Sequence, residues 1–354
     1  MKKSIRMGAI CGLLCLSLTA CDIPFVNKFF GKSEADNVKP SAVVFTFDHE
    51  NVELNEVFIY AEVVRGAYEA RYGSGVWDIE TKDSENIMAS MEDITKKDIV
   101  NDIRTTKAMA KKASEYGISL SDDDIIDIRT DSVSFFKNLT DEQIKKMNID
   151  EELVEKVYSE NVLANRVHNA LMEEGTTEVS DEEARMTTFF DLYFPTYMED
   201  ATGSAVPYTE EQKQTVKANA DEALAEYENP DNPLTNDELY AKHNLKFGGE
   251  RTLSTSEMVS EYGEEVVNGL YSLENGEHTG VVETEFGYHI FTMIELTNSV
   301  ETAKVKEELL KEKQKTYVES KLSEWLVDLS PDWSYDTAVD KDVLGNIHFS
   351  ETGE

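Results

Sequence analysis

Cysteine is almost absent from this chain of 354 residues, and the three cysteines, Cys11, Cys15 and Cys21, all lie close to the N-terminus. The rest of the chain therefore has no thiol, which excludes a disulfide framework, a cysteine-based metal site and a cysteine nucleophile. The stability of the folded part must come from ordinary hydrophobic cores. The chain is long enough to build two such cores, and we expect two domains.

Basic residues are also scarce. The chain has 34 Lys and Arg against 71 Asp and Glu, a formal net charge of −37 at pH 7. Such a surface repels nucleic acid and other polyanions, so we expect no nucleic-acid partner. The densest acidic cluster, residues 122–124, lacks the spacing and the glycine of an EF-hand and is typical of a solvated helix start. The sequence predicts no metal site and no cofactor.

The N-terminus has the pattern of a secretory signal. Lys2, Lys3 and Arg6 precede an apolar stretch from Met7 to Ala20, and small residues end it before Cys21. This apolar stretch is too short to span a bilayer as a helix, whereas a basic segment, an apolar segment and small residues in this order are typical of a cleaved leader. We therefore predict a signal peptide over residues 1–20.

The sequence Leu-Thr-Ala-Cys at residues 18–21 resembles the lipobox of bacterial lipoproteins. The resemblance implies cleavage before Cys21, a diacylglyceryl thioether on its sulfur and acylation of the freed amine, for example by palmitate. Two or more acyl chains give stable membrane anchoring. We therefore expect an extracytoplasmic protein, lipid-anchored to the bacterial cell membrane. The alternative is an ordinary cleaved signal in which Cys21 is incidental.

After the leader, residues 21–41 are predicted to form a tether and residues 42–183 a helical domain. Apolar residues such as Val57, Ala61 and Val64 recur at helical spacing, and capping residues such as Ser121 and Thr140 mark helix starts. The absence of a glycine-rich phosphate loop favours an interaction domain over a nucleotide-dependent enzyme.

Residues 184–299 are predicted to form a small α+β domain in the order β-α-α-α-β-β. The first strand is Met186–Phe194, Phe247–Glu250 is interpreted as a turn, and two strands meet at Phe286-Gly287. A long helix from 301 to 329 follows. Its apolar stripe has no partner in so small a domain, so we expect it to return to the helical domain, which residues 300–349 would complete. Trp333–Phe349 is interpreted as an extended tail.

The segment from Gly248 to Ile290 resembles the parvulin family of peptidyl-prolyl isomerases. The residues that carry the resemblance are Gly248-Gly249, Met258, Gly276-Glu277 and Thr-x-Phe-Gly-Tyr-His-Ile at 284–290. Together with the leader, the helical domain and the returning helix, the whole chain resembles the PrsA-type foldases and their SurA relatives. The resemblance implies an α+β fold in which a helical chaperone-like domain contains an inserted parvulin-like domain.

The same resemblance implies a site. Met258, Tyr262, Phe286 and Leu253 would form the apolar pocket for a proline ring, and His289 matches one of two histidines in the polar floor. The first strand has Asp191-Leu192-Tyr193-Phe194, with no histidine, in the region where the family has the other one, and the catalytic candidates are His289 and, from this strand, Asp191. With only His289 matching the floor, we expect peptide binding with slow isomerisation. The alternative for a methionine and an aromatic residue at helical spacing is a place in the core.

Two functions follow as hypotheses. The first is a membrane-anchored folding factor for exported proteins, with unfolded or newly exported polypeptides and the bilayer as partners; the sequence leaves open whether the chain is a monomer or a homodimer. The second is a non-catalytic lipoprotein that binds peptide or another ligand and uses the parvulin fold as a scaffold. A transport receptor would need two similar α/β lobes, and the helical first half does not show them.

Overall fold

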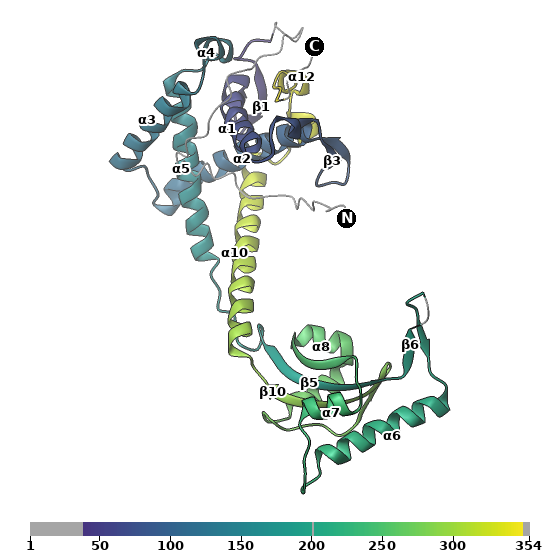
Figure 1. Cartoon of the computed structure of the whole chain (residues 1–354). Helices are drawn as coiled ribbons and strands as arrows, with labels where there is room; N and C mark the ends of the chain where they lie inside the picture. Colours follow the sequence, from purple (N-terminus) through teal and green to yellow (C-terminus); the bar gives the residue numbers. More distant parts are fainter. Residues whose placement is uncertain (1–37, 200–201, 350–354) are drawn as a thin grey trace. The chain divides into compact units, whose positions relative to one another are not determined.

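The structure, a computed structural model, describes residues 38–199 and 202–349 (Figure 1). The predicted leader, Cys21 and most of the predicted tether lie outside the described residues. The chain divides into two compact units: unit 1 combines the residues up to Gly175 with those from Gln314 onward, and unit 2 spans Thr176–Lys313. No helix within the described ranges is both long and apolar enough to cross a membrane.

Unit 1 begins with a β-hairpin, where the sequence analysis expected helix from residue 42. Strands β1 (Val43–Phe47) and β2 (Glu50–Glu53) pair antiparallel. Asp48 and His49 adopt positive φ angles of 46° and 64° in the connecting turn. A run of β-branched and aromatic residues before a two-residue turn of this kind favours a hairpin, so the helical interpretation of this segment was wrong.

Helices form the rest of the first half. They are α1 (Leu54–Tyr72), α2 (Met91–Lys112), α3 (Asp122–Lys137), α4 (Asp141–Met147) and α5 (Glu151–Glu174). A short hairpin, β3 (Glu80–Lys82) with β4 (Met88–Ser90), separates α1 from α2, and 3-10 turns lie at Ser74–Asp78 and Ala113–Tyr116. The helix starts predicted at Ser121 and Thr140 are confirmed, because each forms a complete capping box.

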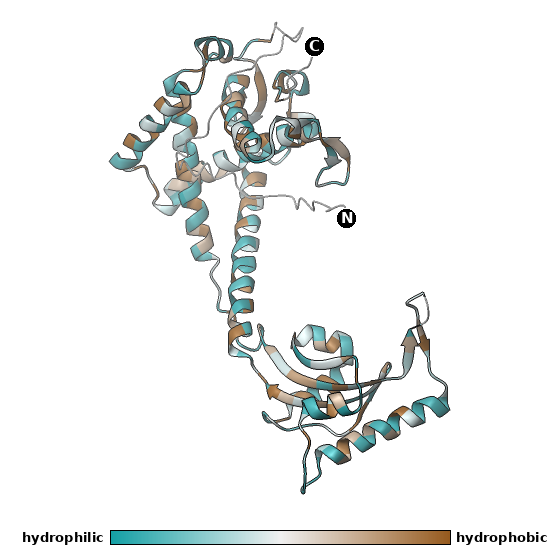
Figure 2. Ribbon diagram, in the orientation of Figure 1, coloured by the Kyte–Doolittle hydropathy of each residue, from teal (hydrophilic) through white to brown (hydrophobic). Residues whose placement is uncertain are grey.

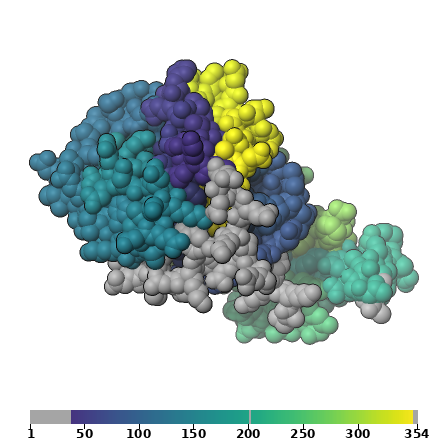
Figure 3. Space-filling model, turned by 90° about the horizontal axis from the view of Figure 1, so that it is seen from above, coloured from purple at the N-terminus to yellow at the C-terminus, as the bar shows by residue number. Residues whose placement is uncertain are grey.

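The chain returns to unit 1 through the long helix α10 (Ser299–Leu329), which begins in unit 2. Within unit 1, Val318 and Trp325 of this helix are buried in one cluster with Met109, Val167 and Leu171. Figure 3 shows the yellow C-terminal residues beside the purple segment that contains β1, and the amide of Asp340 donates to the carbonyl of Val44 at 2.8 Å.

The residues after α10 are not the extended tail that was predicted. They form two short helices, α11 (Tyr335–Ala338) and α12 (Lys341–Leu344). Phe349 is buried and stacks on Trp77 at a ring-centroid distance of 4.5 Å. Aromatic residues near a chain end find partners in a core formed by distant segments, which local sequence patterns do not reveal.

Unit 2 is built on a four-stranded antiparallel sheet in the order β8-β5-β10-β9. Its strands are β5 (Met186–Pro195), β8 (Gly248–Ser254), β9 (Val282–Thr284) and β10 (Gly287–Glu295), and a separate hairpin consists of β6 (Tyr197–Glu199) and β7 (Ala205–Pro207). The helices are α6 (Glu210–Tyr227), α7 (Asn236–Lys242), α8 (Thr255–Tyr262) and α9 (Glu264–Tyr271). The β6–β7 hairpin and strand β8 were missing from the predicted order, and the predicted turn at 247–250 is the start of β8.

Alternation along β5 divides the sheet into two faces, and hydrophobic residues follow both central strands (Figure 2). Phe190, Leu192 and Phe194 pack on one face with residues of α6 and α7. Phe189 lies on the other face, in a cluster with residues of α8, α9 and β10. Asp191 and Tyr193 share this second face, where both contact His289 of β10.

Candidate functional site

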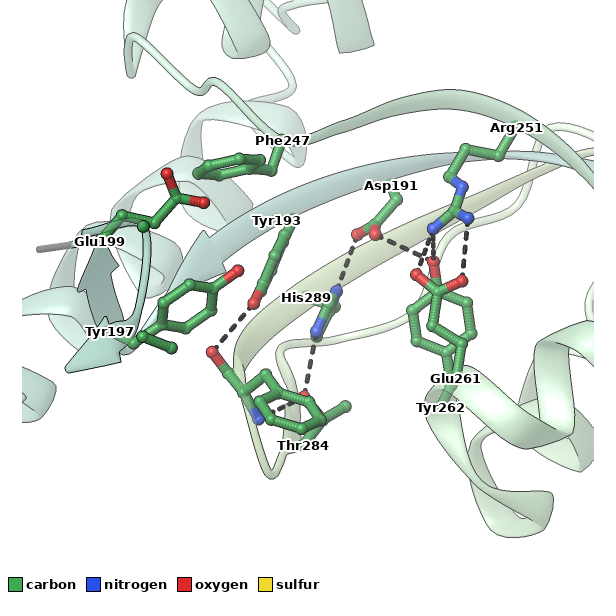
Figure 4. Close-up of a pocket in the computed structure, with 13 residues that line it drawn as sticks. Asp191, Tyr193, Tyr197, Glu199, Phe247, Arg251, Glu261, Tyr262, Thr284 and His289 are labelled. Atoms are coloured by element: carbon green, nitrogen blue, oxygen red, sulfur yellow. Dashed lines mark hydrogen bonds and ion pairs between the residues drawn. The ribbon is translucent and has the colours of Figure 1, made fainter. Parts of the chain in front are cut away.

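A cleft of about 550 Å³ opens on the second face of the unit 2 sheet. Its volume lies within the range typical of small-ligand and peptide sites. The lining comes from β5, β8, β10, the β6–β7 hairpin and the end of α8 (Figure 4). The lining residues are Asp191, Tyr193, Tyr197, Glu199, Gly203, Ala205, Phe247, Arg251, Glu261, Tyr262, Thr284, Phe286 and His289.

Asp191 and His289 form the polar centre of the cleft. Oδ1 of Asp191 lies 2.9 Å from Nδ1 of His289, and the two residues are only 1% and 3% exposed. A carboxylate in this position accepts a hydrogen bond from the N–H group at Nδ1, which fixes the orientation and the tautomer of the imidazole. Because the pair is buried, each side chain has lost its contact with water and needs the other as its polar partner.

Two hydroxyl groups extend this pair. Nε2 of His289 lies 3.1 Å from Oγ1 of Thr284, and the hydroxyl of Tyr262 donates to Oδ2 of Asp191 at 3.3 Å. Burial, together with the nearby Asp191 carboxylate, raises the pKa of Tyr262 above its usual range. The phenol therefore keeps its proton and remains a donor. The four side chains form a continuous polar chain from Thr284 to Tyr262.

Aromatic rings enclose the imidazole. The ring of Tyr193 is stacked on His289 at 4.4 Å with an interplanar angle of 2°, and Phe291 stacks against it at 5.1 Å. The pairing register explains the first contact, because His289 is directly opposite Tyr193 across β10 and β5. The hydroxyl of Tyr193 donates to the carbonyl of Phe286 at 3.0 Å, which ties the β9–β10 turn to β5.

Strand β8 approaches β5 closely beside Asp191. Gly248 has a φ of +87°, and a Cβ atom there would lie 2.3 Å from the carbonyl oxygen of Asp191. Only glycine allows this conformation and this approach at the same time. The Gly-Gly sequence that was interpreted as a turn is therefore a point of strand contact that helps to position Asp191.

Arg251 is the arginine among the lining residues, and both of its terminal nitrogens donate to neighbouring side chains. Nη2 donates to Oε2 of Glu261 at 2.8 Å, Nη1 also bonds Glu261, and Nη1 donates to the hydroxyl of Tyr262 at 2.7 Å. The paired geometry is the strong form of an arginine–carboxylate contact. Arg251 therefore holds Glu261 and Tyr262 in place.

Two large aromatic side chains on the rim of the cleft are exposed. Phe286 is 54% exposed and Phe247 is 42% exposed, although both are large hydrophobic residues. Exposed aromatic residues around a polar floor are characteristic of a surface that buries an apolar group of a ligand. The arrangement can hold a small apolar ring over a fixed, water-poor set of hydrogen-bonding groups.

The structure brings together four of the residues selected from the sequence: His289, Asp191, Tyr262 and Phe286 all line the cleft. Met258 and Leu253 do not line it. Met258 is fully buried between the sheet and α9, and Leu253 packs against the same cluster. Met258 thus lies in the core, which was the alternative for a methionine at helical spacing, and Leu253 borders the same cluster and not the cleft.

Sequence reasoning missed Thr284 and Arg251, and it counted His289 as the only match to the polar floor. Asp191 and Tyr193 are two positions apart on one strand, which places them on the same face and was a usable signal. The contact of Tyr193 with His289 depends on the register of strands far apart in the chain, for which the sequence has no local signal.

Residues 201–295 match the rotamase family described as the PPIC-type PPIase domain. Among curated proteins, the chain is similar to a foldase protein PrsA of Clostridium perfringens, with 23% identity over 308 residues that cover 81% of this chain and 80% of that protein. Two solved structures are also similar. The peptidylprolyl isomerase PrsA of Bacillus cereus has 16% identity and a TM-score of 0.25, covering 76% of this chain and 97% of that chain.

The second structure is that of a SurA-like chaperone of Campylobacter jejuni, with 10% identity and a TM-score of 0.28, covering 80% of this chain and 94% of that chain. The matched family segment contains β7, β8, α8, β9 and β10, and thus most of the cleft lining. Residues 201–295 of this chain accordingly match the PPIC-type peptidyl-prolyl isomerase domain, and the chain is similar to a PrsA foldase over most of its length.

Proposed function

We propose that the unit 2 cleft catalyses cis–trans isomerisation of X-Pro bonds in polypeptide clients, and that the whole chain is a protein-folding factor. The observation that carries the proposal is the hydrogen-bonded chain from Thr284 to the buried residues His289, Asp191 and Tyr262, beside exposed aromatic residues at the rim. The rotamase match and the foldase names of the relatives support it.

The chemistry requires no nucleophile. Rotation about a peptide bond faces a barrier of roughly 18–20 kcal/mol because amide resonance must be lost. A cleft that removes water from the carbonyl disfavours the charge-separated resonance form, which lowers the cost of twisting. In this cleft the apolar rim, including Phe286, would hold the proline ring, and the polar floor would stabilise the twisted amide.

The floor is suited to this role because its groups are already fixed. Asp191 orients His289, Tyr193 and Phe291 restrict the imidazole by stacking, and Tyr262 is held by Arg251. Polar groups that need no reorganisation give the largest stabilisation of a transition state. The expectation of slow isomerisation depended on a floor reduced to His289, and the additional groups remove that reason.

For the whole chain, we infer that unit 1 binds unfolded or newly exported polypeptides while unit 2 acts on their prolines. The leader over residues 1–20 supports export, and the lipobox resemblance at Cys21 supports a lipid anchor on the bacterial cell membrane. Both sequence features favour a site of action outside the cytoplasm, where exported chains fold. Homodimerisation is part of the proposal and is tested by light scattering of the purified chain.

One experiment separates the folding factor from the non-catalytic alternative. The full chain is assayed for prolyl-peptide isomerisation and, in parallel, for suppression of aggregation of a denatured client protein. We expect both activities, with isomerisation lost in Asp191→Ala and aggregation suppression retained. Aggregation suppression without any isomerisation would support the scaffold hypothesis instead.

The anchor has its own test. Mass spectrometry of the N-terminal peptide from membranes should show acyl groups on Cys21, and Cys21→Ala should release the protein or leave it unprocessed. An unmodified peptide that begins elsewhere would contradict the proposed anchor.

A further inference from the structure

One end of the cleft carries a carboxylate that the proposed isomerisation does not use. Tyr197 and Glu199 are two positions apart on β6, so their side chains point to the same side, and both line the cleft. Within the described part of the chain, the carboxylate of Glu199 forms no ion pair or hydrogen bond, whereas Asp191 is paired with His289 and Arg251 with Glu261.

The cleft therefore has an uncompensated negative charge. In Figure 4, Glu199 and Arg251 lie at opposite ends of the cleft, with Tyr193 and His289 between them, so Arg251 does not neutralise Glu199. Lys246 is next to the lining residue Phe247 but forms no ion pair with Glu199 in the described structure. The segments around the cleft add further acidic residues, Glu283 and Glu285, and the whole chain has a net charge of −37.

We propose that Glu199 is a specificity-determining residue, which gives the cleft a preference for proline flanked by lysine or arginine. The inference rests on the proposed function, because it assumes that the cleft holds a proline. A long basic side chain beside that proline can lay its aliphatic stem along the aromatic rings of Tyr197 and Phe247 and place its charge near Glu199. The acidic surroundings of the cleft attract the same segments at longer range.

The expected effect is moderate, because Glu199 is exposed to solvent. A partly exposed ion pair corresponds to a preference of about two- to fivefold for a lysine peptide over a leucine peptide. The preference should shrink as ionic strength rises, since salt screens exposed charges. A glutamate peptide should be disfavoured by a similar factor.

The test uses the full chain and peptides of the form Ala-X-Pro-Phe with X as Lys, Leu or Glu, and Ala-Leu-Pro-Lys for the other flank. Both the isomerisation rate and the peptide affinity are measured, the affinity by NMR titration. Glu199→Gln should bring the ratio of the lysine to the glutamate peptide towards one. The matched control is Glu222→Gln on α6, an exposed glutamate outside the cleft lining, which should leave that ratio at its wild-type value.

Equal use of all peptides by the wild type, or a ratio unchanged in Glu199→Gln, would overturn the inference. A preference for the glutamate peptide would also overturn it and would show that Arg251 leaves Glu261 to bind the substrate. If no peptide is isomerised but lysine peptides bind more tightly through Glu199, the isomerase proposal fails and the specificity inference stands. If the peptides are isomerised but at equal rates and with equal affinity, the isomerase proposal stands and the specificity inference fails.

Discussion

Nδ1 of His289 lies 2.9 Å from Oδ1 of Asp191, although the two residues are 98 positions apart in the sequence. The pairing of β10 with β5 brings them together, and Gly248 on β8 allows the close approach that completes the sheet at Asp191. A buried carboxylate costs free energy unless a hydrogen-bonding partner such as this imidazole compensates it. The contact therefore links the architecture of the sheet directly to the chemistry of the cleft.

The first prediction concerns the charge of Asp191. Asp191→Asn keeps the size of the side chain but removes the carboxylate that orients His289. We expect kcat/KM for a prolyl peptide to fall by about tenfold or more, the usual scale for the loss of one preorganised polar group. The control is Asp231→Asn, an exposed aspartate of the same unit. An unchanged kcat/KM in Asp191→Asn would show that the pair is structural only.

The second prediction separates the core from the site. Met258→Ala should destabilise unit 2 by about 2–5 kcal/mol, because it leaves a cavity in a fully buried cluster. Phe286→Ala should change the free energy of unfolding by about 0.5 kcal/mol or less, since the side chain is largely exposed. The same variant should weaken peptide binding about fivefold, because apolar contact with the proline ring is lost.

Circular dichroism melts and peptide titrations of both variants measure these effects. The opposite pattern, with Met258→Ala stable and defective in binding, would return Met258 to the substrate pocket.

Much of unit 2 could be predicted from its sequence because its signals are local. The first strand from Met186 and the strand pair at Phe286-Gly287 are confirmed, and capping boxes at Thr209, Thr235 and Ser254 start three of the helices. Strand β8 was missed because a Gly-Gly sequence is usually a turn, and only the close contact of Gly248 with Asp191 shows why the first glycine begins a strand.

The residues of the candidate site also fall into those with a local sequence signal and those without one. His289 and Phe286 belong to a contiguous motif, which the sequence alone could identify. Tyr193 and Arg251 act through the register of paired strands and through a contact with the end of α8, and neither has a local signature. Met258 is the opposite case. Its position in the motif implied a place in the substrate pocket, whereas its side chain packs in the core.

The third prediction tests the approach of β8 to β5. Gly248→Ala should destabilise unit 2 by about 2 kcal/mol or more, since it adds a steric clash with Asp191 to an unfavourable positive φ. Gly249→Ala is the matched control: its φ is +85°, but no atom lies within 4 Å of the added Cβ. This control should cost only about 1 kcal/mol. Equal losses in the two melts would contradict the close contact.

The fourth prediction concerns pH and unit 1. Burial, and to a lesser extent neighbouring Asp98, raise the pKa of Asp102 from 3.8 to about 7. The folded state therefore holds this proton more tightly than the unfolded state does. The resulting stabilisation is complete below about pH 4 and is lost as the pH rises towards 7.

Asp102→Asn removes the ionisation and should make unit 1 more stable than the wild type at pH 8, by about 2 kcal/mol, with little difference at pH 4. Tryptophan fluorescence in denaturant reports unit 1 selectively, because Trp77, Trp325 and Trp333 all lie there. Asp332→Asn, an exposed aspartate of the same unit, is the control. A stability difference that is independent of pH would contradict the raised pKa.

The most direct test of the account is the rate of cis–trans exchange in a proline-containing peptide, measured by NMR with the full chain and with its His289→Ala variant. Peptide titration of the variant verifies that the cleft still forms. We expect that the wild type accelerates exchange and that His289→Ala binds the peptide but loses most of the acceleration. Exchange at the uncatalysed rate with the wild type, or equal acceleration by both proteins, would contradict it.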